Sequence, residues 1–120
     1  MGKKSKSVWS SKVGRDCVSL DTKMCRWLGK RLSHLAKHST GVPQDYINLV
    51  ESMHDEGRDT KFFHKCWKRE MSAAGEALTR YGNMFRDGMV KGDVEVTSTV
   101  LDDAQSAMRW VAKWLPNLWD

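Results

Sequence analysis

Apolar residues recur at helical spacing across residues 60–86, and this period constrains the fold more than any other feature of the chain. At 3.6 residues per turn the apolar positions form one continuous face. That face consists of Phe62, Phe63, Cys66, Trp67, Met71, Ala73, Ala74, Ala77, Leu78, Tyr81 and Phe85. The period predicts an amphipathic helix about 40 Å long. Gly75 and Gly82 fall on its polar side, where we expect them to weaken the helix without entering the core.

Three further segments, over about 20–37, 43–56 and 97–115, show the same helical period. Pro43 suits the first turn of one of these helices, and Pro116 stops another. Residues 93–100 also alternate as a strand would, but a lone strand has no pairing partner, so we favour a helix there. The sequence therefore predicts an all-α, four-helix bundle-like domain over residues 19–120. Residues 1–18 lack a sustained period and are predicted to form a basic, partly disordered arm.

Positive charge is concentrated at the start of the chain. Residues 1–38 carry ten Lys and Arg against two Asp, a net charge of +8, whereas residues 39–120 have a net charge of −3. Such segregation favours a polyanionic partner over an evenly solvated surface. The alternative, that the cations only solvate helix faces, stays open for the 23–37 stripe.

The candidate binding residues fall into three groups. We expect them in the arm, on the outer stripe of the 20–37 helix and on the first turns of the 60–86 helix. They are Lys3, Lys4, Lys6, Lys12, Arg15, Lys23, Arg26, Lys30, Lys37, Lys61, Lys65, Lys68 and Arg69. No base-reading motif accompanies them, so the prediction is RNA or DNA bound through its phosphates without strong sequence preference.

Arg31 and Glu70 are charged residues that fall within apolar helical faces. Each is costly to bury alone, so we expect them to form an interhelical ion pair that fixes helix register. Glu70 has no second carboxylate, metal site or nucleophile to support catalysis. Phosphate-loop, nucleophile-elbow and H-E-x-x-H motifs are absent, and no catalytic residue is assigned. The sequence thus predicts a protein that is not an enzyme.

The three Cys and four His residues do not have the spacing of a zinc site. Free thiols and solvated histidines are the preferred interpretation. We therefore expect no metal and no cofactor.

Two other classes of function remain open. One is a peripheral membrane or matrix-like structural protein that binds an anionic membrane surface through the arm. The start M-G-K-K-S-K makes Gly2 a candidate for acylation, although position 6 is Lys where Ser or Thr is favoured. The other is an assembly or adaptor subunit that contacts a protein partner, or a second copy, through Trp110, Trp114 and Trp119. Core packing is preferred for Trp110 and Trp114.

The chain carries no run of about 18 apolar residues and no apolar segment of the secretory type at its start. We therefore expect an intracellular protein, cytoplasmic or nuclear, that is neither secreted nor transmembrane. A small basic helical bundle with a polybasic arm occurs in viral structural and nucleic-acid packaging proteins and in many unrelated modules, so architecture alone does not decide the function.

Overall fold

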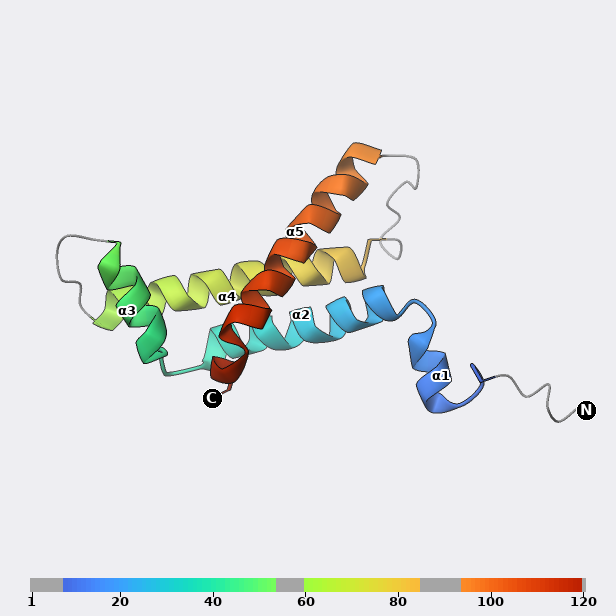
Figure 1. Cartoon of the computed structure of the whole chain (residues 1–120), viewed down its shortest axis with the longest axis horizontal. Coiled ribbons are helices and arrows are strands. Elements are labelled where there is room, and N and C mark those ends of the chain that lie inside the picture. Colours follow the sequence, from blue (N-terminus) through green and yellow to red (C-terminus); the bar gives the residue numbers. More distant parts are fainter. Residues whose placement is uncertain (1–7, 54–59, 85–93, 120) are drawn as a thin grey trace, which may run out of the picture.

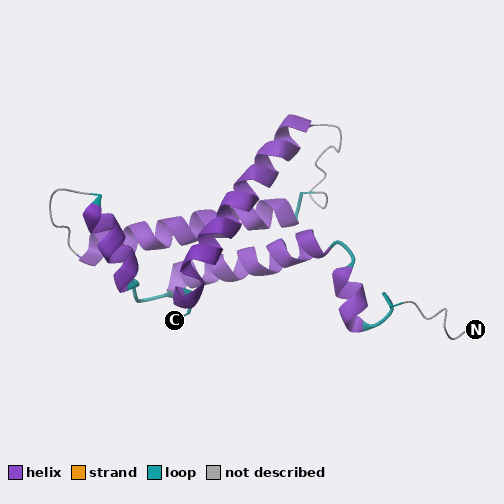
Figure 2. Ribbon diagram, viewed as in Figure 1, coloured by secondary structure: helices purple, strands orange, loops and turns teal. Residues whose placement is uncertain are grey.

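The computed structural model describes residues 8–53, 60–84 and 94–119, and its regular structure there is entirely helical (Figures 1 and 2). The elements are α1 (Lys12–Cys17), α2 (Leu20–His38), α3 (Gln44–Ser52), α4 (Thr60–Gly82), α5 (Val94–Trp114) and the short 3₁₀ turn η2 (Leu115–Asn117). The predicted all-α class is confirmed. Gly2, Lys3, Lys4 and Lys6 lie outside the described residues.

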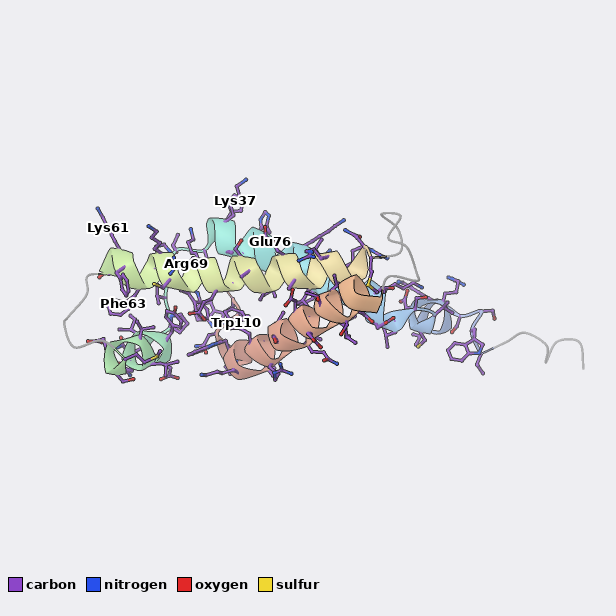
Figure 3. The ribbon with its side chains drawn as sticks, turned by 90° about the horizontal axis from the view of Figure 1, so that it is seen from above. Lys37, Lys61, Phe63, Arg69, Glu76 and Trp110 are labelled. Carbon is purple, nitrogen blue, oxygen red and sulfur yellow. The ribbon has the colours of Figure 1, made fainter. Side chains whose placement is uncertain are left out.

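Helix α4 is the centre of the fold. It lies antiparallel beside α2, while α3 and α5 both pack on one face of the layer that these two helices form (Figures 1 and 3). The first turn of α2 therefore reaches the end of α4, where the Tyr81 hydroxyl donates to the Asp21 carboxylate at 2.6 Å. The predicted bundle-like arrangement is also confirmed: α2 and α4 form a two-helix layer that α3 and α5 cover on one face, with α5 crossing α4 obliquely (Figure 1).

The contact between α2 and α4 is a close backbone approach at glycines. A Cβ atom added to Gly29 would lie 2.7 Å from the carbonyl oxygen of Gly75, and one added to Gly75 would lie 2.9 Å from the carbonyl oxygen of Gly29. A Cβ on Gly82 would lie 2.7 Å from the Arg26 backbone nitrogen. The prediction that Gly75 and Gly82 lie on a polar surface is wrong. They allow two helices to approach more closely than any side chain permits.

Large aromatic side chains pack on the face of α4 that α3 and α5 cover. The ring of Trp67, which is 2% exposed, lies 5.0 Å from Tyr46 of α3. It also lies 5.2 Å from Trp110 and 5.5 Å from Trp114 of α5. These are the separations at which offset and edge-to-face aromatic pairs are favourable. Three helices are thus joined by one aromatic cluster, and Trp110 and Trp114 pack within it as expected.

Most helix boundaries agree with the sequence prediction, and the differences are local. The second predicted helix ends at Ser52 instead of about residue 56, and the third ends at Gly82 instead of about residue 86. Residues 94–100 are helical, which decides between helix and strand for that part of 93–100. The predicted arm contains a helix, α1, whose start is capped by the Ser11 hydroxyl accepting from the Gly14 amide at 3.0 Å.

A sharp turn at Ser19 separates α1 from α2. Ser19 has φ 55° and ψ 45°, the left-handed conformation that residues with a side chain rarely adopt. The Lys23 ammonium donates to the carbonyl oxygen of Arg15 at 2.6 Å across this turn. Helix α1 therefore leaves the body of the molecule at an angle instead of extending α2 (Figure 1).

Candidate functional site

The two predicted cationic stripes lie on the same face of the α2–α4 layer. Because the helices are antiparallel, the last turns of α2 lie beside the first turns of α4. The Lys68 ammonium donates to the carbonyl oxygen of Lys37 at 3.3 Å, and His64 Nε2 lies 3.3 Å from the carbonyl oxygen of Ser39. Figure 3 shows Lys37 and Lys61 on the side of the layer away from Trp110 and α5. We call this surface the cationic face.

The exposed cations of this face are not engaged by carboxylates. Lys30, Lys37, Lys61 and Lys65 are all exposed, and none forms an ion pair among the described residues. Arg69 is also exposed, and its guanidinium lies 3.7 Å from the Cys66 sulfur. These ammonium groups are therefore available to a ligand that brings negative charge.

Arg26, Lys68 and Lys23 of the predicted set donate to backbone carbonyl oxygens at the ends of helices. The Arg26 guanidinium donates to the carbonyl oxygen of Gly82 at 2.6 Å, at the end of α4. Lys68 and Lys23 do the same for Lys37 and Arg15. Cations at helix C-termini complement the helix dipole and satisfy orphan carbonyls. Arg26 in particular is half-buried and has a structural role that the sequence did not indicate.

Few carboxylate side chains lie on the cationic face. Of the three carboxylates on α2 and α4, Asp21 turns to Tyr81 and Glu70 turns to α3 and α5. Glu76 is exposed and lies on the cationic face, above the layer in Figure 3. The charge of this face is therefore strongly positive.

Two histidines of α2 lie at the border between the cationic face and the outer side of the helix. His34 and His38 are exposed, and their ring centroids lie 4.4 Å apart. His34 follows Lys30 by one helical turn and lies roughly 40° beyond it around the helix, so the spacing of the lysine stripe already places His34 at its border.

The predicted ion pair between Arg31 and Glu70 is not formed. The Arg31 guanidinium lies 4.2 Å from the centroid of the Trp27 ring and donates to the carbonyl oxygen of Trp27. At 100° per residue, Arg31 lies roughly 160° from Gly29, and Glu70 roughly 140° from Gly75. Since the glycines mark the contact between α2 and α4, both charged side chains point away from it. The prediction failed because the actual contact face was mistaken for a polar one.

Glu70 instead accepts two hydrogen bonds from side chains of the aromatic cluster. It accepts from the Tyr46 hydroxyl at 2.6 Å and from Trp110 Nε1 at 3.0 Å. Burial raises the pKa of Tyr46 well above its usual range, and the hydrogen bond to Glu70 adds to the effect. Glu70 therefore satisfies two polar groups that enter an apolar cluster, which is a structural role.

The described part of the arm has its own internal contacts. Lys12 lies 3.7 Å from the Asp16 carboxylate, and Arg15 donates to the carbonyl oxygen of Ser10. Both cations remain exposed, but they lie on α1, beyond the end of the α2–α4 layer (Figure 1). The structure thus separates the arm from Lys61, Lys65, Lys68 and Arg69, which lie at the opposite end.

Other candidate groups are dispersed. The described cysteine thiols are free: Cys17 is exposed, Cys25 is buried and Cys66 is half-buried. Burial, followed by the nearby Asp21 charge, raises the pKa of Cys25. No three metal-ligating side chains gather in the part of the chain that the structure describes. Trp119 is 73% exposed, so it alone of the three predicted contact tryptophans is free of the core.

None of the helices over the described residues is long and apolar enough to span a bilayer. Comparisons with protein-family models, with curated proteins and with solved structures gave no match to this chain.

Proposed function

We propose that this protein binds RNA or DNA through the cationic face, by contacts to phosphates and without strong sequence preference. The observation that carries the proposal is that four exposed lysines from two antiparallel helices lie on one side of the layer, with Glu76 as the carboxylate that these helices add to it.

The chemistry of this face suits a polyphosphate. Lysine ammonium groups are mobile point charges that accommodate phosphates at varied spacing, whereas base recognition needs rigid bidentate donors. Both helices lie lengthwise in the layer, and neither presents its end at this face as a recognition helix does (Figure 3). The face therefore supports charge-driven binding to the backbone.

Salt dependence is the first test. If about four lysines each neutralise one phosphate, the logarithm of the association constant falls with slope of about −3.6 against the logarithm of salt concentration for B-DNA. Fluorescence anisotropy with a labelled duplex and a labelled single strand measures this slope. Binding that does not change with salt would contradict the proposal.

A charge-reversal pair supplies the matched control. Lys37→Glu combined with Lys65→Glu removes two neighbouring cations from the face, so the salt slope should fall by about 2 units and affinity should drop steeply. Lys113→Glu makes the same kind of change on α5, on the opposite side of the layer, where Lys113 lies 5.3 Å from the centroid of the Trp114 ring. It should leave the slope nearly unchanged.

Vesicles separate nucleic acid from the membrane alternative. At equal salt, vesicles of anionic lipid are compared with the labelled nucleic acids. Tighter binding to the vesicles, lost in the Lys37→Glu, Lys65→Glu variant, would assign the face to a membrane surface instead.

A further inference from the structure

A second uncovered surface lies beside the cationic face and is apolar. It combines the outer stripe of α2, the α1 segment and one side chain of α5, and we call it the apolar edge. Its large apolar side chains are each between 38% and 78% exposed. They are Val8, Trp9, Val13, Val18, Leu20, Met24, Trp27 and Leu101.

The stripe on α2 follows from helix geometry. Leu20, Met24 and Trp27 are spaced at i, i+4 and i+7, so they share one side of the helix. Gly29 faces α4, and this stripe lies roughly on the opposite side of α2. The Arg31 guanidinium stacks on the Trp27 ring and continues the stripe by one turn. The stripe therefore faces outward and is covered by neither α4 nor α5.

A groove joins this stripe to α5. It has a volume of about 420 Å³ and is lined by Met24, Cys25, Tyr81, Leu101 and Met108, among others. Because α5 crosses α4 obliquely, it diverges from the first half of α2 and leaves this groove open (Figure 1). Apolar surface is thus continuous from α2 into the groove.

Helix α1 brings further apolar surface to the same end of the molecule. The left-handed turn at Ser19 directs α1 away from the groove and leaves Val13 and Val18 73% and 54% exposed. A left-handed serine is strained and persists only where other contacts hold it. In this chain the strained turn exposes valines instead of burying them.

We infer that the apolar edge is a self-association surface, on which a second copy of this chain docks to form a dimer. The eight exposed side chains offer on the order of 800 Å² of apolar area, about what one partner of a standard interface buries. Isolated surface leucines need no explanation, but this much exposed apolar area on α1, the first half of α2 and the facing side of α5 marks an interaction site.

The charge at the α1 end of the apolar edge is compatible with a second copy. Residues 8–22 contain Lys12 and Arg15 against Asp16 and Asp21, so their net charge is zero within a chain of net charge +5, whereas Arg31 and Arg109 lie at the other end of the edge. Lys12 and Asp16 pair with each other, and Asp21 is bound by Tyr81. The near-neutral apolar end formed by residues 8–22 is self-complementary, which a two-fold interface requires. The cationic face occupies a different sector of α2, so this inference does not depend on the proposed function.

The test is the mass of the full chain by multi-angle light scattering from low to high micromolar concentration. The wild type should pass from monomer to dimer as concentration rises. Met24→Glu and Leu20→Glu should each raise the dissociation constant at least tenfold, because each buries a charge at the centre of the edge. Met53→Glu is the matched control: Met53 is 71% exposed at the end of α3 and should leave association unchanged.

Two results would overturn the inference. One is a wild-type mass that stays monomeric over the whole range. The other is a dimer that Met24→Glu and Leu20→Glu do not weaken while their helical circular dichroism matches the wild type. If neutral-lipid vesicles retain a protein that is monomeric in solution, and Val13→Glu releases it, the edge binds a lipid surface and the inference is equally wrong.

Discussion

The two sides of α4 are packed by opposite means. Toward α2, Gly29 and Gly75 bring backbone against backbone, so the contact is made of small residues. Toward α3 and α5, Trp67 meets Tyr46, Trp110 and Trp114 in a cluster of large rings. Added side-chain atoms should destabilise the glycine contact, whereas removed side-chain atoms should destabilise the aromatic cluster. The difference shows that a central helix can pack by small residues on one face and by large rings on a neighbouring face.

The largest effect is expected from emptying the aromatic side. Trp67→Ala removes the buried ring that joins three helices, and it should lower the free energy of unfolding by about 3–5 kcal/mol. Trp119→Ala changes the same residue type at a 73% exposed position and should cost less than about 0.5 kcal/mol. Chemical denaturation monitored by circular dichroism measures both. Equal losses in the two variants would contradict the central role of Trp67.

At the glycine contact we expect a loss of stability from overpacking, that is, from an added side chain instead of a removed one. In an isolated helix Gly75→Ala gains about 1 kcal/mol from helix propensity. Here the new Cβ would lie 2.9 Å from the Gly29 carbonyl oxygen and from the Ser33 amide nitrogen, so we expect a net loss of about 1–3 kcal/mol. Gly41→Ala is the control, because its Cβ meets nothing within 4 Å and should leave stability equal or slightly higher. A stabilised Gly75→Ala protein would show that the helices are not in close contact.

A substitution at Glu70 tests how much its hydrogen bonds to Tyr46 and Trp110 stabilise the aromatic cluster. Glu70→Ala leaves the hydroxyl of Tyr46, a residue that is 1% exposed, without its acceptor, and should cost about 1–3 kcal/mol. Glu76→Ala, one and a half turns further along α4 on the cationic face, should change stability by less than about 0.5 kcal/mol. Denaturant midpoints compare the two. If both variants unfold at the same midpoint, the two hydrogen bonds to Glu70 do not stabilise the cluster.

The smallest effect is a pH dependence at the α2–α4 contact. The hydrogen bond from Tyr81 to Asp21, with burial, raises the pKa of Tyr81 to about 12, and the same bond lowers the pKa of Asp21. The stabilisation tied to Tyr81 is therefore complete below pH 10.0, its ordinary pKa, and is lost as pH rises toward about 12. The part tied to Asp21 is present above pH 3.8 and is lost as pH falls through the lowered pKa.

Tyrosinate absorbance makes this measurable, because the chain has two tyrosines, Tyr46 and Tyr81. In Asp21→Asn the lower of the two titration midpoints should move down toward 10.0. Asp16→Asn, which removes an exposed carboxylate from α1, should leave the profile unchanged. An unaltered profile in Asp21→Asn would mean that the bond between α2 and α4 is not formed in solution.

The candidate site was predictable in its members and only partly in its assembly. Helical period placed Lys30 and Lys37 on one stripe and Lys61 and Lys65 on another, because period depends only on spacing along the chain. Which stripes share a face depends on the order and direction of the helices. The period also carried no information about Arg26, whose carbonyl partner, Gly82, is 56 residues away.

The sequence by itself determined α2, α3, α4 and α5 and the lysine stripes of α2 and α4, since these follow from local spacing of apolar and charged residues. It also placed Trp67, Trp110 and Trp114 correctly in the core. Only the tertiary structure decided that α2 and α4 meet at glycines, that Arg31 and Glu70 point apart, and that one edge of α2 stays uncovered. The reason is physical. In the sequence, a glycine inside a helix indicates only a low helix propensity. It becomes a packing contact when a second backbone occupies the space that its missing side chain leaves.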